Sequence, residues 1–95
     1  MAYRTTRQAD EDIIDIYRWG CRKFGQPQAE RYHEGLAATL DLIGDNPRIA
    51  RERTEFNPPV RLHAYQAHMI VYVVDDHGVL IVRVLYGRQD WERHL

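Results

Sequence analysis

Apolar residues recur through the first half of the chain at intervals of three and four, which is the period of an amphipathic helix. One stripe consists of Ala9, Ile13, Ile16, Tyr17, Gly20 and Phe24. A second stripe consists of Ala29, Tyr32, Leu36, Leu40 and Ile43. Gly25 and Pro27 separate the stripes, and Thr5 or Thr6 offers a hydroxyl cap to the first helix. We therefore predict a helical hairpin that ends before Asn46.

The second half of the chain changes to the pattern of β-strands, with short runs of β-branched and aromatic residues. We predict strands over residues 2–5, 60–65, 68–74 and 79–86, with a hairpin turn at Asp75-Asp76-His77-Gly78. Residues 48–59 read as a polar, basic loop closed by two prolines. The predicted fold class is α+β. It is a two-layer β-α-α-β-β-β arrangement in a single domain over residues 1–95, an antiparallel sheet with an α-hairpin packed on one face.

Both sides of the predicted strands are apolar, although two helices can cover only one face of a small sheet. In residues 79–86, Ile81 and Leu85 point one way while Leu80, Val82 and Val84 point the other. A surplus apolar face usually indicates a partner. The alternatives are that the C-terminal segment or a loop folds over it, or that these residues are simply good strand formers.

Composition limits the possible functions. The 95 residues are 44% hydrophobic and 28% charged with a formal net charge of -1, so no overall field favours nucleic acid or membrane. One cysteine, Cys21, excludes an intramolecular disulfide framework. No apolar run is long enough to cross a bilayer, and the N-terminus lacks the apolar stretch of a signal peptide. We expect a soluble, cytoplasmic protein with no membrane partner.

Arg61 and Arg83 lie on predicted strands and are the main candidates for chemistry. They are accompanied by His63, Tyr65, His68, Tyr86 and the loop residues Arg48, Arg51 and Arg53. Guanidinium groups with a histidine or tyrosine could hold a phosphate and move protons, as a metal-free ribonuclease requires. Alternatively, the strand arginines pair with Glu55, Asp75 or Asp90, and the spacing alone favours this structural interpretation.

Other sites are not indicated. The five histidines have no zinc-binding spacing, and the chain contains neither a glycine-rich phosphate loop nor a nucleophile elbow, so we expect no metal and no cofactor. The acidic residues Asp10, Glu11, Asp12 and Asp15 suit the start of a helix. We interpret Tyr17, Trp19, Tyr32 and Tyr72 as core or interface aromatics.

Several segments together resemble one family. These are AxxDIxxIYxW (residues 9–19), FGQPQAERY (24–32), DNPRIARER (45–53), VRLHAYQAHMIVYVVDD (60–76) and RVLYGRQDW (83–91). They are similar to the ParE toxins of type II toxin–antitoxin modules over nearly the whole chain. The RVLxGRQD ending is the specific part, whereas the helical stripes would fit many folds.

The resemblance implies a growth-inhibiting toxin in a hetero-oligomer with a cognate ParD-like antitoxin, whose extended and helical tail wraps over it. ParE toxins are associated with poisoning DNA gyrase. The structurally related RelE toxins instead cut mRNA on the ribosome, and this is the alternative function. Because DNA binding in such modules normally resides in the antitoxin, we expect no direct sequence-specific DNA binding.

The residues favour a gyrase poison without catalysis. RelE-type cleavage relies on several basic side chains and an acid such as a C-terminal tyrosine, but Lys23 is the sole lysine and no tyrosine follows Asp90. Tyr86 stands where the ParE family usually carries histidine. If the chain is a ribonuclease, its catalytic residues are Arg61, His68, Arg83 and Tyr86. A module that has lost its toxicity is a third possibility.

The end of the last strand serves structure and recognition. We expect Gly87 to allow the exit from the strand, Asp90 to cap a short turn and Trp91 to pack on the core. Arg83 and Arg88 would then form a positive patch for a protein partner. The predicted target- or antitoxin-binding residues are Arg61, His68, Tyr72, Ile81, Arg83, Leu85 and Arg88.

Overall fold

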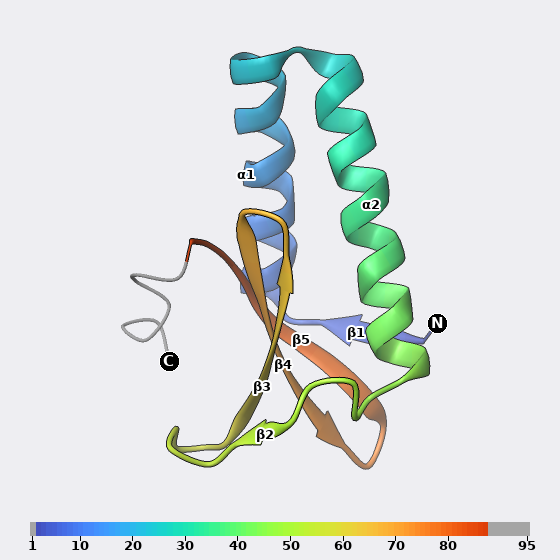
Figure 1. The fold of residues 1–95 in the computed structure, drawn as a ribbon, viewed down its shortest axis with the longest axis vertical. Coiled ribbons are helices and arrows are strands. Elements are labelled where there is room, and N and C mark those ends of the chain that lie inside the picture. Colours follow the sequence, from blue (N-terminus) through green and yellow to red (C-terminus); the bar gives the residue numbers. More distant parts are fainter. Residues whose placement is uncertain (1, 88–95) are drawn as a thin grey trace.

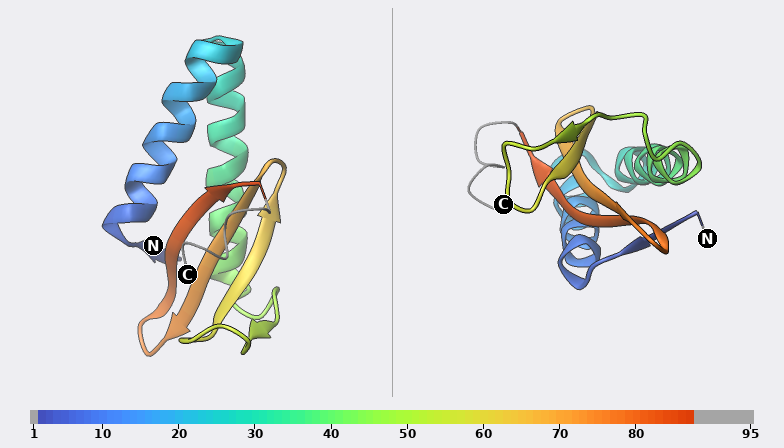
Figure 2. Two further views of the ribbon diagram at one scale, coloured as in Figure 1. Left: turned by 90° about the vertical axis from the view of Figure 1, so that its left-hand side faces the viewer. Right: turned by 90° about the horizontal axis from the view of Figure 1, so that it is seen from below.

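The computed structural model describes residues 2–87 and shows two helices on a five-stranded sheet (Figure 1). The elements are β1 (Tyr3–Thr5), α1 (Arg7–Phe24), α2 (Gln26–Asp45), β2 (Glu52–Arg53), β3 (Val60–Tyr65), β4 (His68–Asp75) and β5 (Gly78–Tyr86). The lower halves of the helices lie against one face of the sheet, and the upper halves extend beyond it (Figures 1 and 2). The predicted α+β class with a helical hairpin is confirmed.

The helix ends follow from local chemistry. The Thr6 hydroxyl accepts a hydrogen bond from the Ala9 N–H at 3.0 Å, which caps the start of α1. Gly25 ends this helix at a φ of 89°, a value that favours glycine. Pro27 occupies the first turn of α2, where its missing N–H is no loss. The hairpin therefore begins and turns where the sequence predicts.

The sheet has the strand order β1-β5-β4-β3-β2. The strands from β2 to β5 are antiparallel to their neighbours, but β1 runs parallel to β5, so the sheet is mixed instead of wholly antiparallel. The predicted loop over residues 48–59 also contains β2, which pairs with β3 at two positions. Both differences arise from long-range pairing, which the local residue pattern does not encode.

A bulge in β5 changes which residues face the helices. Val71 pairs with Arg83 while the next residue, Tyr72, pairs with Ile81, so Val82 is an extra residue in β5. As a result, Ile81 and Val84 lie in the same helix-facing core, although a regular strand would place them on opposite faces. Part of the surplus apolar character of this strand therefore comes from the bulge.

The second face of the sheet is partly covered by the loop before β3. Val60, Val71 and Leu85 form a small buried cluster there, and Phe56 packs against it. Folding of a loop over this face, one of the alternatives considered from sequence, is thus observed. Arg88, Asp90 and Trp91 lie outside the described residues. Within residues 2–87, neither helix is long and apolar enough to cross a membrane.

Candidate partner-binding site

Arg83 joins the sheet to the first helix through Asp12. Its Nε lies 2.8 Å from Asp12 Oδ2, and its Nη2 lies 3.0 Å from Asp12 Oδ1. The same carboxylate accepts the Val84 backbone N–H at 3.0 Å. The hydrogen bonds that Arg83 donates to Asp12 raise the pKa of Arg83 above its usual range. The guanidinium therefore stays charged, and the Asp12 carboxylate balances its charge.

Arg61 holds the loop that follows α2. Its Nη1 donates to the Ala50 carbonyl oxygen at 2.6 Å, and the Ala50 N–H donates to the Tyr72 hydroxyl at 3.3 Å. The Tyr72 hydroxyl donates in turn to the Pro47 carbonyl oxygen at 2.9 Å. β4 lies between the strands that carry Arg61 and Arg83. Arg61 binds a backbone carbonyl of the loop, whereas Arg83 binds the Asp12 carboxylate of α1. The two candidates thus serve separate structural contacts.

His68 lies at the start of β4 and is only 7% exposed. Its Nδ1 is 2.7 Å from the Tyr32 hydroxyl, and its ring packs edge-on against Tyr32 and Tyr86. Burial lowers the pKa of His68, and the charge of Asp12 offsets this only in part. Burial likewise raises the pKa of Tyr32, so the pair favours a neutral imidazole beside a protonated phenol.

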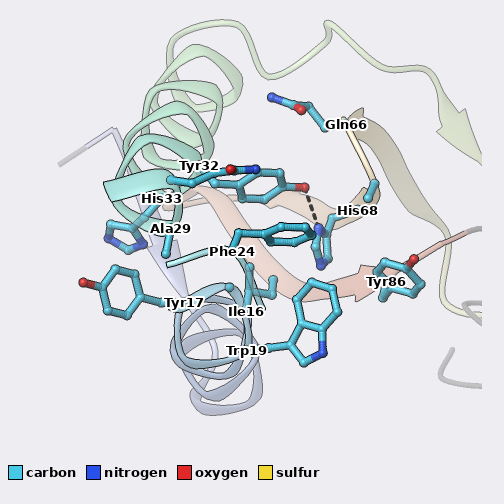
Figure 3. Close-up of a pocket in the computed structure, with 13 residues that line it drawn as sticks. Ile16, Tyr17, Trp19, Phe24, Ala29, Tyr32, His33, Gln66, His68 and Tyr86 are labelled. Carbon is cyan, nitrogen blue, oxygen red and sulfur yellow. Dashed lines mark hydrogen bonds between the residues drawn. The ribbon is translucent and has the colours of Figure 1, made fainter. Parts of the chain in front are cut away.

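A cavity of about 260 Å³ opens beside His68, between the helical hairpin and the turn that joins β3 to β4 (Figure 3). We call it the aromatic pocket; its main lining residues are Ile16, Trp19, Phe24, Tyr32, His68 and Tyr86. Trp19 is 44%, Phe24 53% and Tyr86 70% exposed, and Trp19 contacts both of the other rings. Exposed aromatic rings around a cavity are typical of a surface that a partner covers.

The part of the hairpin that carries this pocket is positively charged. Between positions 18 and 31, one acidic residue, Glu30, accompanies four basic ones, all exposed: Arg18, Arg22, Lys23 and Arg31. The whole chain, in contrast, has a formal net charge of -1. This segment is therefore locally basic, although none of these four residues lines the pocket.

A family model described as the ParE toxin of the type II toxin–antitoxin system parDE matches residues 3–91. The chain belongs to this ParE toxin family. It is 30% identical over 93 residues to Toxin ParE1 of Caulobacter vibrioides, covering 98% of this chain and 96% of that protein. Toxin ParE3 of the same organism is 24% identical over 85 residues, covering 90% of this chain and 85% of that protein.

A solved structure of the chromosomal ParDE TA system from P. aeruginosa has the same fold. Its matching chain superposes with a TM-score of 0.80 at 18% identity, covering 93% of this chain and 97% of that chain. The ParE resemblance of the sequence is confirmed, and membership of a toxin–antitoxin family implies an antitoxin as partner.

The ParE-family fold places the predicted binding residues in three environments. Tyr72 and Ile81 are fully buried in the helix-facing core, and Leu85 is 7% exposed under the Phe56 loop, so none of the three offers a surface. Arg61 and Arg83 are held by the contacts described above. His68 lines the aromatic pocket beside Tyr86. Arg88 lies outside the described residues.

The exposed pocket residues Trp19 and Phe24 were not among the predicted site residues. The sequence favours a core or interface role for Trp19, which lies off the apolar stripe of its helix. A tryptophan outside the apolar stripe of an amphipathic helix indicates an exposed aromatic ring, and this feature of the sequence could have identified Trp19 as a site residue. Phe24 gave no such signal, because it fits the stripe; it is the last residue of α1 and is exposed.

Among the described residues, no group of three or more histidine, cysteine, aspartate or glutamate side chains is arranged to hold a metal ion. His63 carries the one buried side-chain polar atom, Nδ1, that has no hydrogen-bond partner in the part of the chain described.

Proposed function

We propose that this ParE-family protein inhibits growth by binding and poisoning DNA gyrase, without catalysis, in the cytoplasm. The observation that carries the proposal is the combination of an exposed aromatic pocket with strand arginines that are already engaged. A ribonuclease needs cations free to face a phosphate, whereas Arg83 is balanced by Asp12 and Arg61 is bound to a carbonyl. Exposed aromatic rings around a cavity instead favour recognition of a protein.

We further propose that a ParD-like antitoxin neutralises the toxin in a hetero-oligomer by covering the aromatic pocket. Trp19, Phe24 and Tyr86 together expose a large apolar area that is costly to leave in water. Sequence-specific DNA binding is assigned to the antitoxin, in keeping with the small net charge of this chain.

The deciding experiment measures supercoiling and DNA cleavage by purified gyrase with ATP and the purified protein. A translating ribosome extract receives the same preparation and is probed for cuts in mRNA. We expect gyrase-linked DNA breaks to accumulate while mRNA stays intact. Codon-phased mRNA cuts with unaffected gyrase would refute the proposal.

A ribosome-dependent endoribonuclease of RelE type is the second candidate. One observation favours it: His68 and Tyr86 lie side by side in the pocket, with ring centroids 5.5 Å apart. A neutral imidazole beside a phenol could take and supply a proton. If this function is correct, Tyr86→Phe abolishes mRNA cleavage while leaving the fold intact, because the Tyr86 side chain is 70% exposed.

A further inference from the structure

One ring nitrogen of His68 has no hydrogen-bond partner in the described part of the chain. Nδ1 is 2.7 Å from the Tyr32 hydroxyl, whereas Nε2 bonds to no described residue. His63 Nδ1 is the one fully buried, unpartnered polar side-chain atom within residues 2–87, so Nε2 keeps access to solvent. Because His68 is only 7% exposed, this access runs through the cavities that it lines. In Figure 3 the ring edge away from Tyr32 points toward Trp19 in the aromatic pocket.

The distances around the Tyr32 hydroxyl assign a hydrogen to Nε2 of His68. This hydroxyl lies 2.7 Å from His68 Nδ1 and 3.5 Å from the Tyr65 carbonyl oxygen, and the second distance exceeds the usual range of a hydroxyl hydrogen bond. The hydroxyl therefore donates to Nδ1. Burial lowers the pKa of His68 and so favours the neutral imidazole. A neutral imidazole that accepts at Nδ1 carries its hydrogen on Nε2, so His68 offers one N–H donor.

The lining of the aromatic pocket favours an uncharged occupant. No aspartate, glutamate, lysine or arginine of the described residues lines it. An ionic group would lose its hydration there without gaining a counter-charge, which is costly. Aromatic rings alone can attract a cation, but the basic stretch over residues 18–31 opposes one.

The rings around the pocket favour a flat occupant of small size. Trp19 is edge-on to Phe24, with ring centroids 5.6 Å apart, and is tilted by 52° against Tyr86 at 6.4 Å. Rings inclined in this way offer faces and edges to a further aromatic ring. The cavity of about 260 Å³ lies just under the roughly 300 Å³ at which pockets for drug-sized ligands begin. The occupant therefore has about one or two fused rings.

We propose that the aromatic pocket is a small-molecule site for an uncharged heteroaromatic compound whose ring nitrogen or carbonyl oxygen accepts the His68 Nε2–H. The rings of Trp19, Phe24 and Tyr86 pack against the compound and exclude water from it. The donor selects for an acceptor, because a compound without one leaves the N–H unpaired once water is displaced. The site itself does not rest on the proposed function, whereas competition with an antitoxin on the same rings does.

The test uses NMR titration of the full chain with two bicyclic probes, quinoline and indole. Quinoline is uncharged at neutral pH and its ring nitrogen accepts a hydrogen bond, whereas the indole nitrogen only donates one. We expect both probes to shift the ring signals of Trp19 and His68. Quinoline should bind about tenfold more tightly, because indole leaves the His68 N–H unpaired. Nitrogen spectra of the His68 side chain should show the hydrogen on Nε2.

Four variants separate the donor from the rings. His68→Phe keeps a ring without the donor, and should weaken quinoline about tenfold while leaving indole nearly unchanged. Tyr32→Phe removes the hydroxyl that fixes the hydrogen on Nε2, and should reduce the preference for quinoline about threefold. Tyr86→Leu, at a side chain 70% exposed, should weaken both probes about fivefold. Ile14→Ala is the control, since Ile14 is 49% exposed outside the pocket, and should leave both affinities unchanged.

Equal affinities of the unaltered chain for quinoline and indole would overturn the proposal. So would a preference for quinoline that persists in both folded variants of His68 and Tyr32, or a hydrogen found on Nδ1. Shifts confined to Leu42, Ile49 and Val74, which line a separate hollow beside the end of α2, would assign the probes elsewhere and refute the pocket site. Failure of the gyrase assay with the expected titration would refute the proposed function and leave the pocket site standing.

Discussion

Arg83 on β5 and Asp12 on α1 form a two-point ion pair, with hydrogen bonds of 2.8 and 3.0 Å, although 71 positions separate them along the chain. The side chains are 19% and 16% exposed, so water screens the pair only weakly. Because Asp12 also accepts the Val84 N–H, one carboxylate fastens α1 to β5. Substitution of Arg83 therefore tests stability as well as recognition.

Asp12→Ala should lower the free energy of unfolding by about 2–4 kcal/mol, because it leaves a poorly exposed guanidinium and a backbone N–H without their acceptor. Urea denaturation followed by circular dichroism measures this loss. Asp15→Ala is the matched control, since Asp15 is an exposed carboxylate on the same helix, and should change stability by about 0.5 kcal/mol at most. Similar losses in the two variants would contradict the structural role of the pair.

Stability should fall in mild acid because of His68. Burial lowers the pKa of the folded-state imidazole below its usual 6.5, so the unfolded chain binds a proton more readily. The contribution is fully present above the unfolded pKa and is lost as pH falls through 6.5 toward the folded pKa, with a slope of up to about 1.4 kcal/mol per pH unit.

Urea unfolding at about pH 7.5 and about pH 5.5 brackets the ordinary histidine pKa and measures this effect. His68→Phe should flatten the difference between the two conditions. His77 lies exposed in the turn between β4 and β5, so His77→Asn serves as the comparison in which a surface histidine is removed. An unchanged pH dependence in His68→Phe would show that other groups cause it.

Gly35→Ala should destabilise the protein by about 1–3 kcal/mol, although the same change in an open helix position stabilises by up to about 1 kcal/mol. A Cβ on Gly35 would overlap the Tyr65 hydroxyl, which donates to the Tyr32 carbonyl oxygen at 3.3 Å. Tyr65→Phe removes the nearest overlapping atom and should recover part of the loss, as thermal or urea unfolding of the double variant measures. Strict additivity of the two changes would contradict this contact.

Trp19→Ala should weaken antitoxin binding about thirtyfold, corresponding to about 2 kcal/mol for an aromatic anchor, with little change in stability because the side chain is 44% exposed. Isothermal titration calorimetry with the purified antitoxin measures the affinity. Ile14→Ala on the same helix is the control, since Ile14 is 49% exposed and does not line the pocket. Equal affinities of the two variants would exclude the aromatic pocket from the interface.

The two helices, the longer strands and the turns between them were predictable from short stretches of the sequence. Thr6 caps α1, Gly25 and Pro27 make the hairpin bend, and Gly78 closes the turn between β4 and β5 with a φ of 103°. Helix stripes, strand runs and turns depend on residues close together in the chain, so their signals survive without tertiary information. The resemblance to ParE toxins rests on the same short segments, and the match of the ParE family model to residues 3–91 confirms it.

Tertiary structure decided the rest, because it depends on which distant residues meet. The parallel pairing of β1 with β5, the two-residue β2 and the extra residue Val82 in β5 all follow from strand register, which leaves no periodic trace in the sequence. The role of Asp12 also depends on tertiary structure. From the sequence it is an acidic residue near the start of a helix, whereas in the fold it binds Arg83. Sequence alone thus determined the two helices, the longer strands and the family. Packing decided which arginines are engaged and which aromatic rings remain exposed.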